Sequence, residues 1–339
     1  MKQNLIVSVV VCALGLALLS AETAPNSPLT LVRTVDLPGI EGDLDHLSLD
    51  SAGGRLLLTA EDNGTVRVVD LNNFKVAQTL EGFKTPHSIL HLPQAHSLFI
   101  TDGSDTVQVR DSRTYQLVKR ISTTPGADSI GFDQQRGLLY AVTGGKDVDM
   151  KKSFLSVIDV NQGKLLKEIP IDAAHVEAMA LELSGPRLFV NVTDKNYLAV
   201  IDRNTGDVTG RWPIKEAQEN APIALDEAHQ RLYVVCRKPS TLVVLDAATG
   251  KTIASFPTGE RADEAIYDRA HKRVYVLAGQ GKVYPYQAVD ANHFEPLTPV
   301  PSAPGAKTGL LSPDGTELYV SVSPGEGKTG AKLLIFNVN

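Results

Sequence analysis

A short segment that ends in an aspartate recurs along this chain and constrains its fold more than any other feature. Its five clearest copies lie 41 to 48 residues apart: Val68-Val69-Asp70, Val107-Gln108-Val109-Arg110-Asp111, Val157-Ile158-Asp159, Val200-Ile201-Asp202 and Val244-Leu245-Asp246. Weaker copies, Val289-Asp290 and Phe336-Asn337, continue the series. An internal repeat of this length indicates an architecture built from seven similar units.

Each unit also contains an earlier apolar segment and a turn that follows the aspartate. The earlier segments begin at Arg55, Ser97, Gly137, Arg187, Arg231, Arg273 and Glu317. The turns include Asn161-Gln-Gly-Lys, Asn204-Thr-Gly-Asp and Ala248-Thr-Gly-Lys, in which glycine supplies a positive φ. Residues 223–260 show the pattern most clearly, with four short apolar runs that are rich in β-branched residues and too short for helices. Each unit therefore predicts a meander of four strands.

A period of about 40 to 45 residues with four strands per unit is typical of a β-propeller blade, including WD-like repeats. We therefore predict an all-β fold in which residues 30–339 form one seven-bladed propeller of four-stranded antiparallel blades. The last unit supplies only three strands, so the strand at 30–39 should complete it and close the ring, which removes unpaired sheet edges. A solenoid is the alternative, but it requires polar caps at both ends. The expected blades are 44–83, 85–125, 126–174, 175–218, 219–260, 261–304, and 305–339 with 30–39.

The first 21 residues resemble a secretory signal peptide. Lys2 precedes an uncharged apolar run from Leu5 to Leu19, and Ser20-Ala21 gives small residues before the polar Glu22. The run is short for a bilayer span, which needs about 20 apolar residues. We expect cleavage near Ala21, a flexible lead-in at 22–29, no membrane span after cleavage, and a periplasmic or secreted protein.

Cysteine content fits an exported protein whose core must hold the fold without disulfides. The sequence has two cysteines, Cys12 within the expected signal peptide and Cys236. After cleavage no intramolecular disulfide is possible, and roughly 310 residues suffice to bury a core. Cys236 follows Val234-Val235, so we expect a buried small apolar residue there and not a reactive thiol.

Charge argues against nucleic acid and anionic membranes as partners. The formal net charge is −6, and the charged residues are mixed along the chain without long runs of one sign. Duplex nucleic acid and anionic lipid both require clustered Lys and Arg. No Cys-x-x-Cys-His motif for covalent haem and no phosphate-binding loop for a nucleotide is present, and the single Trp212 disfavours a quinone propeller docked by tryptophans.

The first residues of each blade's innermost strand provide the functional signal. In a propeller these residues face the mouth of the central channel. Alignment of the seven units places Asp45, His87, Asp128, Glu177, Ala221, Asp263 and Lys307 there, followed by His46, Ser88, Ser129, Ala178, Pro222, Glu264 and Thr308, with Asn220 just before Ala221. Six of the seven leading residues are ionisable, although the strands are otherwise apolar.

Several kinds of chemistry fit this ring. Asp45, His46, His87, Asp128 and Glu177 offer oxygen and imidazole ligands for a divalent metal. The ring of Asp45, His46, His87, Asp128, Glu177, Asn220, Asp263, Glu264 and Lys307 would also bind a small polar molecule, or act as acid and base. The alternative is a purely structural ring that holds water and satisfies the strand ends.

An insertion at 144–152 lengthens the third unit. It contains Asp147-Val-Asp149, which suggests calcium, but it lacks the glycine and the distal glutamate of a hand-type calcium loop. We therefore interpret it as a solvated charged loop on the outside of the fold.

The chain resembles the YncE-like family of exported bacterial propellers with YVTN-type repeats. The segments that carry the resemblance are Asp45-His-Leu-Ser-Leu-Asp50, Gly185-Pro-Arg-Leu-Phe-Val-Asn-Val192, Ala224-Leu-Asp-Glu-Ala-His-Gln-Arg-Leu-Tyr233, Cys236-Arg-Lys-Pro239 and Ala303-Pro-Gly-Ala-Lys307. The resemblance implies the propeller fold over essentially the whole mature chain. Some members are associated with single-stranded DNA, which requires basic and aromatic groups that are scarce here. Seven-bladed lactonases, which act through a polar cluster at the channel mouth, are a more distant resemblance.

These observations predict an exported binding module whose channel mouth takes a small polar ligand or a divalent metal. A hydrolase of lactonase type that uses the same residues is the alternative. A protein-interaction scaffold without a small-molecule site is the third.

Overall fold

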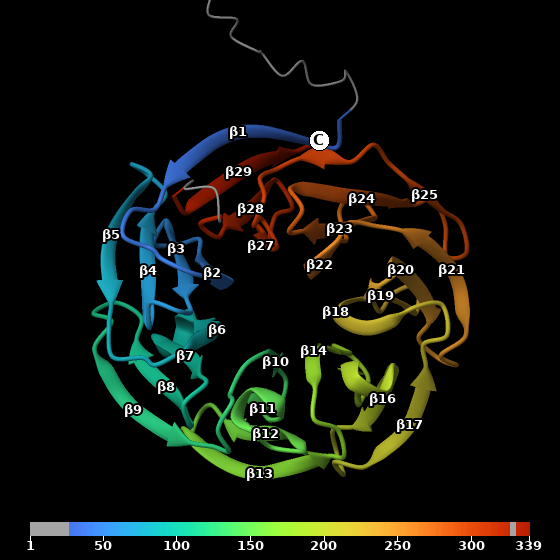
Figure 1. Ribbon diagram of the computed structural model, residues 1–339. Helices are drawn as coiled ribbons and strands as arrows, with labels where there is room; N and C mark the ends of the chain where they lie inside the picture. Colours follow the sequence, from blue (N-terminus) through green and yellow to red (C-terminus); the bar gives the residue numbers. More distant parts are fainter. Residues whose placement is uncertain (1–26, 326–329) are drawn as a thin grey trace, which may run out of the picture.

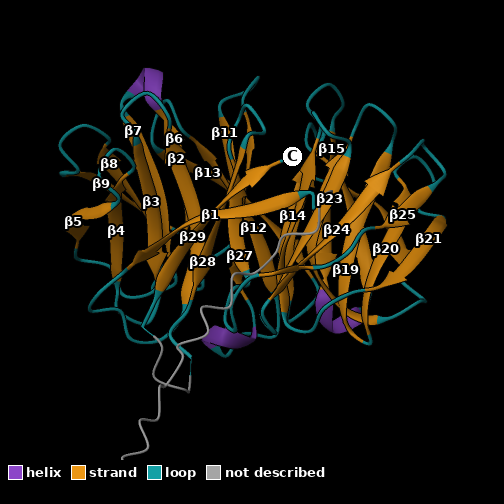
Figure 2. Cartoon of the chain, turned by 90° about the horizontal axis from the view of Figure 1, so that it is seen from above, coloured by secondary structure: helices purple, strands orange, loops and turns teal. Residues whose placement is uncertain are grey.

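The computed structural model describes residues 27–325 and 330–339, and the expected signal peptide lies outside this range. The described chain forms seven antiparallel sheets arranged in a ring around a central channel (Figure 1). This architecture confirms the predicted seven-bladed propeller. Loops and turns cover the two rims of the ring, and the strands form its wall (Figure 2). In the described residues no helix has the length and apolar character needed to cross a membrane.

Each blade is a meander whose first strand lies at the channel and whose last lies at the circumference. Blade 1 contains β2 (Leu44–Asp50), β3 (Arg55–Ala60), β4 (Thr65–Asp70) and β5 (Lys75–Leu80), and blade 2 contains β6 (Pro86–Leu92), β7 (Ser97–Asp102), β8 (Thr106–Asp111) and β9 (Leu117–Ser122). Blade 3 contains β10 (Ile130–Asp133), β11 (Leu138–Gly144), β12 (Ser153–Asp159) and β13 (Lys164–Ile171), and blade 4 contains β14 (Val176–Leu181), β15 (Arg187–Val192), β16 (Tyr197–Asp202) and β17 (Val208–Pro213).

The remaining three blades follow the same order with one exception. Blade 5 contains β18 (Gln218–Asp226), β19 (Arg231–Lys238), β20 (Ser240–Asp246) and β21 (Thr252–Pro257). Blade 6 contains β22 (Ala262–Asp268), β23 (Arg273–Ala278) and β24 (Lys282–Ala288), but its outer strand is split into β25 (Phe294–Pro296) and β26 (Val300–Pro301). The split follows from Pro296, Pro299 and Pro301, because proline cannot donate to a strand ladder.

Blade 7 contains strands from both ends of the described chain. It consists of β27 (Thr308–Leu311), β28 (Glu317–Val322), β29 (Lys332–Val338) and, at the outside, β1 (Leu29–Asp36). β1 pairs with β29 from Leu29 opposite Val338 to Asp36 opposite Lys332. The predicted closure by the early strand is therefore confirmed, and the first and last strands hold each other in place.

The core consists of apolar layers between neighbouring blades. Phe189 and Leu198 of blade 4, for example, pack with Leu232 and Val234 of blade 5, and all four are fully buried. Cys236 lies in the same layer, where burial raises the pKa of its thiol to about 12, as expected for an inert small apolar residue. Because each blade faces a neighbour on both sides, its middle strands are apolar on both faces.

The outer strands share a bulge. The pairing register skips one residue in β5, β9, β13, β17, β21 and β1, and the skipped residues are Ala77, Val118, Leu166, Thr209, Ile253 and Val32. A bulge twists an edge strand and interrupts its row of free backbone groups. The recurring bulges therefore protect the circumference against pairing with other strands. They also leave side chains such as Val118, 67% exposed, in contact with solvent.

Candidate functional site

The innermost strands are irregular where their polar residues face the channel. Register shifts fall between Leu44 and Leu47 in β2, and similar shifts occur at the starts of β6, β14, β18 and β22. Asp45, His87, Glu177 and Asp263 lie within four of these shifts. A bulge releases side chains from the strict alternation of a strand and redirects them. The local irregularity therefore allows adjacent residues to reach the channel.

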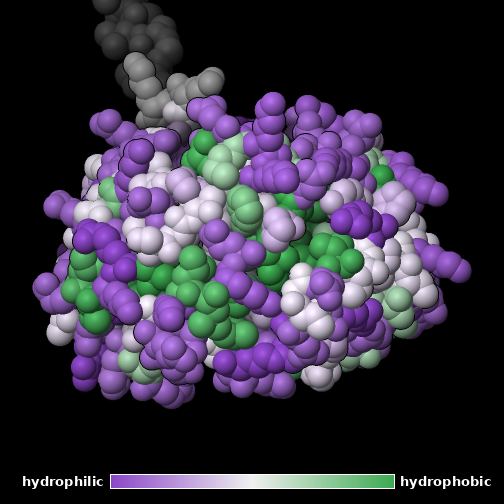
Figure 3. All heavy atoms as spheres, turned by 90° about the horizontal axis from the view of Figure 1, so that it is seen from below, coloured by the Kyte–Doolittle hydropathy of each residue, from purple (hydrophilic) through white to green (hydrophobic). Residues whose placement is uncertain are grey.

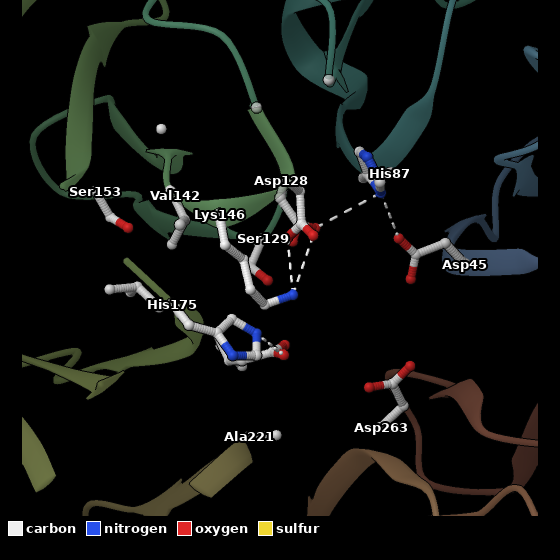
Figure 4. Close-up of a pocket in the computed structure, with 18 of the residues that line it drawn as sticks. Asp45, His87, Asp128, Ser129, Val142, Lys146, Ser153, His175, Ala221 and Asp263 are labelled. Carbon is white, nitrogen blue, oxygen red and sulfur yellow. Dashed lines mark hydrogen bonds and ion pairs between the residues drawn. The ribbon is translucent and has the colours of Figure 1, made fainter. Parts of the chain in front are cut away.

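These side chains line a cavity of about 470 Å³ at the channel mouth (Figure 4). Of the nine residues predicted for the site, seven line it: Asp45, His46, His87, Asp128, Glu177, Asp263 and Lys307. Glu264 contacts the lining residue His46, with Oε2 3.4 Å from Nδ1. Asn220 is the exception. It is fully buried, and its Nδ2 donates to Asn191 Oδ1 (2.7 Å) and Tyr197 O (3.1 Å), so it anchors β18 to blade 4 and does not line the cavity.

His87 forms the centre of a cluster with three carboxylates. Its Nδ1 lies 2.9 Å from Asp45 Oδ2, 3.8 Å from Asp128 Oδ1 and 4.0 Å from Glu61 Oε2. Burial by itself would lower the pKa of His87, but the three carboxylates outweigh it and raise the pKa to about 10. His87 is therefore an imidazolium at neutral pH.

The carboxylates of this cluster respond to their shared environment in different ways. Burial raises the pKa of Glu61 to about 7 and that of Asp128 to about 6. In both groups the negative charge of Asp45 adds to this increase, and the positive charge of His87 opposes it. Burial would also raise the pKa of Asp45, but His46, His87 and Lys307 together lower it. The cluster therefore combines a firmly ionised carboxylate with two that titrate near neutral pH.

His46 connects this cluster to blade 6. Its Nε2 lies 3.5 Å from Asp45 Oδ1, and its Nδ1 lies 3.4 Å from Glu264 Oε2. Burial would lower the pKa of His46, but Asp45, Glu264 and Asp128 raise it well above its usual value. His46 is thus a second cation placed between carboxylates of blades 1 and 6.

A second cluster at the cavity is a chain of ion pairs centred on Arg237. Arg237 Nη1 lies 3.1 Å from Glu177 Oε1, Arg237 Nη2 contacts Asp263, and Lys307 Nζ lies 3.2 Å from Asp263 Oδ2. At one end of this series of ion pairs, His175 Nε2 lies 2.8 Å from Glu177 Oε1. At the other end, Asp43 Oδ2 lies 3.1 Å from Lys307 Nζ. Burial opposes ionisation of Arg237 and Lys307, but the carboxylates raise both pKa values.

The two clusters differ in how fully their charges are paired. All three Arg237 nitrogens donate hydrogen bonds: Nη1 to Glu177, Nη2 to Asp263 and Nε to Ala262 O (3.3 Å). The charges of the Arg237 cluster are therefore already paired. In the His87 cluster three carboxylates surround one imidazolium, and His46 pairs only with Asp45 among them, while the side chains of Glu61 and Asp128 remain 30% and 37% exposed. The His87 cluster is therefore the part of the cavity that can accept a further cation.

The loop 144–152 is a solvated charged loop as predicted, with Lys146 and Asp147 50% and 78% exposed, but it lies at this cavity, so its predicted place on the outside of the fold is wrong. Gly144, Gly145, Lys146, Asp147 and Val148 all contribute to the lining, and Lys146 to Val148 form a 3-10 turn. The Lys146 backbone N–H donates to Ala174 O (2.7 Å), which holds the loop against the connection between blades 3 and 4. The Lys146 side chain lies near Asp128 (Figure 4), and its Nζ is 3.0 Å from Asp147 Oδ1. The insertion therefore adds charged groups beside Asp128.

Five titratable lining residues lie outside the ring predicted from the innermost strands: Glu61, Lys146, Asp147, His175 and Arg237. Glu61 and Arg237 hold equivalent places on the second strands of blades 1 and 5. Each follows the residue that pairs with the position just before the register shift of the first strand: Ala60 opposite Leu44, and Cys236 opposite Asn220. The corresponding residues in blades 2 and 6 are Gly103 and Gly279, next to Asp102 and Ala278. An alignment of second-strand ends would have found both charges.

Asp45, Glu61 and His87 together meet the geometric condition for holding a metal ion. Each offers one ligand atom, and these atoms all lie within 4.8 Å of one another. A metal would replace the proton on His87, since imidazole coordinates in its neutral form. Of the five residues predicted as metal ligands, Asp45 and His87 belong to this group, Asp128 lies beside it, and His46 pairs with Asp45. Glu177 belongs to the Arg237 network.

Comparison with known proteins gives similarity in fold only. No protein-family model and no curated protein sequence matches the chain. A chain in the crystal structure of a mitotic checkpoint complex superposes with a TM-score of 0.76 at 16% identity, covering 98% of this chain and 99% of that chain. A chain of the Kuenenia stuttgartiensis hydrazine synthase superposes with a TM-score of 0.74 at 17% identity, covering 89% of this chain and 99% of that chain. At such low identity these similarities support the propeller fold and nothing further.

Proposed function

We propose that this protein is an exported binding module of the YncE-like type that holds a divalent metal in its central channel, as part of a site for a small polar ligand. The observation that carries the proposal is the convergence of Asp45, Glu61 and His87 from different strands and loops on one point of an open cavity. Export to the periplasm or the medium rests on the signal-like segment at 1–21.

The ligand types favour a transition metal over calcium or magnesium. Two carboxylates and one imidazole suit Mn²⁺, Fe²⁺, Ni²⁺ or Zn²⁺, whereas Ca²⁺ and Mg²⁺ prefer oxygen ligands alone. Three protein ligands leave coordination positions free, as in sites that also bind a small molecule or water. The exposed Asp128 carboxylate and the loop 144–152 would then contact the bound molecule.

The first prediction concerns metal affinity. After removal of bound metal with a chelator, the protein should bind one Mn²⁺ or Zn²⁺ per chain in isothermal titration calorimetry. It should bind Ca²⁺ more weakly than either of these ions. Glu61→Gln and His87→Ala should each weaken the binding at least about a hundredfold, because each removes a ligand directly. His175→Ala is the matched control, since it removes a cavity histidine that pairs with Glu177 outside the cluster, and it should bind like the wild type.

Absence of metal binding, or equal affinity in the His87→Ala and His175→Ala variants, would refute the metal site. Stabilisation of the metal-free protein by small polar compounds in a thermal-shift screen would instead support an organic ligand at the same cavity. No stabilisation by either would favour the interaction-scaffold alternative.

A hydrolase of lactonase type is the second candidate, and Asp128 is the observation that favours it. Its carboxyl group lies beside the His87 cluster, faces the cavity, and has a pKa raised by burial to about 6, close to the range suited to a general base. Turnover of a small lactone by the metal-loaded protein, lost in Asp128→Asn while metal affinity is kept, would establish this activity.

A further inference from the structure

The circumference of blades 2 and 3 combines exposed apolar side chains with an excess of positive charge. β9 is the outer strand of blade 2 and β13 that of blade 3, and the two strands follow each other along the circumference of the ring (Figure 1). Lys119 of β9 reaches the turn before β13, with Nζ 3.5 Å from Gln162 O. We call this surface the basic wall, and it consists of Leu117, Val118, Lys119, Arg120, Lys164, Leu166 and Lys167.

The apolar members of the basic wall are strongly exposed. Val118 is 67% exposed, Leu166 49% and Leu117 38%, and they are three of the seven large apolar side chains that stand out as exposed in the described part of the chain. Val118 and Leu166 are both skipped residues of the outer-strand bulges, which explains why they project instead of packing into a seam. Figure 3 looks onto this side of the molecule and shows apolar patches among hydrophilic side chains.

The charge of the basic wall is opposite to that of the whole chain. β9 carries Lys119 and Arg120 and no acidic residue, and β13 carries Lys164 and Lys167 with Glu168 as its only acid. Glu168 is turned inward, where it accepts hydrogen bonds from Thr124 and Ser156. The four cations therefore give a local positive surface on a protein whose formal net charge is −6.

We infer that the basic wall is a docking surface for an anionic lipid bilayer. Lys and Arg near a membrane surface are each attracted by about 1 kcal/mol to anionic lipid, and their long side chains let apolar neighbours reach the interface. The wall is convex in Figure 1, so its projecting Val118 and Leu166 can enter a soft interface without a complementary pocket. A second copy of the same wall would bring like charges together, which disfavours self-association.

Binding to vesicles tests this inference directly. The protein should co-sediment with vesicles that contain phosphatidylglycerol, should not do so with pure phosphatidylcholine, and should dissociate as salt rises. Arg120→Glu with Lys164→Glu should weaken binding by more than about twentyfold, since each lost cation accounts for about fivefold. Val118→Asp should also weaken it, because a charge replaces a side chain that enters the interface.

Matched controls lie elsewhere on the ring. Lys251→Glu with Lys282→Glu makes the same change of net charge at exposed residues of blades 5 and 6, and Val32→Asp alters the equivalent bulge in β1. These variants should bind vesicles like the wild type if the basic wall is the docking surface. Equal loss in controls and wall variants, equal binding to neutral vesicles, or no binding to anionic ones would overturn the inference. Because the wall is separate from the channel residues, none of these outcomes bears on the metal site.

Discussion

Replacing Arg203 by methionine is expected to lower the free energy of unfolding by about 3 to 5 kcal/mol, measured by urea denaturation followed by circular dichroism. Arg203 of blade 4 pairs with Asp133 of blade 3, and both side chains are almost fully buried, 3% and 4% exposed. Arg203 also donates to the backbone carbonyls of Glu182 and Gly185. Its loss leaves a buried carboxylate with only Arg136 as partner, through its backbone N–H and its half-exposed side chain, at a seam between two blades.

The control for this prediction is an exposed pair of the same chemistry. Arg113 is 64% exposed and lies 3.0 Å from Asp111, so Arg113→Met should cost no more than about 1 kcal/mol. In addition, Arg203→Met with Asp133→Asn should be less destabilised than Arg203→Met alone, because the second change removes a buried charge that has lost its buried cation and keeps only Arg136. A double variant as unstable as the sum of the single ones would show that the pair contributes through packing and not through its charges.

The sequence predicts the ring better than its details because the repeat records what all blades share. Seven copies of one strand pattern indicate seven blades, and the three-stranded last unit points to closure by the early strand, as β1 and β29 show. The split outer strand of blade 6 departs from the repeat because Pro296, Pro299 and Pro301 interrupt its ladder. These prolines were visible in the sequence, but alignment on apolar segments gives them no weight.

The site was predictable only where it follows the repeat. Asp45, His87, Asp128, Glu177, Asp263 and Lys307 hold equivalent positions, and they line one cavity. Glu61 and Arg237 come from the C-terminal ends of the second strands of their blades, which the alignment of the first strands did not include. Lys146 comes from an insertion in blade 3. The prediction that Asn220 belongs to the site is wrong for a different reason. A polar residue at a strand start is as well suited to a buried hydrogen bond with Asn191 as to a ligand site.

The basic wall shows a limit of charge analysis along the chain. Lys119 and Arg120 are about 45 residues from Lys164 and Lys167 in sequence, so no run of positive charge is visible. The propeller places residues one period apart on neighbouring outer strands. A fold with a repeat of this length can therefore assemble a charged surface from residues that the sequence scatters.

The stability of the protein should fall between pH 6.5 and pH 10, and more steeply in the wild type than in a His87→Gln variant. The pKa of His87 is raised from 6.5 to about 10, so its contribution to stability is complete below pH 6.5 and is lost as pH rises through 10. Such a shift corresponds to at most about 5 kcal/mol. The groups that face the imidazole are Asp45, Glu61 and Asp128, and solvent in the cavity weakens their attraction below that limit.

Urea denaturation at intervals from pH 4 to pH 10, carried out without metal, measures this difference. Glu61 has a raised pKa of about 7, so protonated Glu61 adds stability below pH 4.5 that is lost as pH rises to 7, in the same direction as His87. Asp45 has a lowered pKa, and its contribution is lost in acid instead. The wild type should therefore be most stable in mildly acidic solution, and His87→Gln should flatten the alkaline limb of the profile. Parallel profiles for the two proteins would mean that His87 is not held as an imidazolium by the three carboxylates. The cluster would then lack the concentration of negative charge that makes it suited to a metal ion.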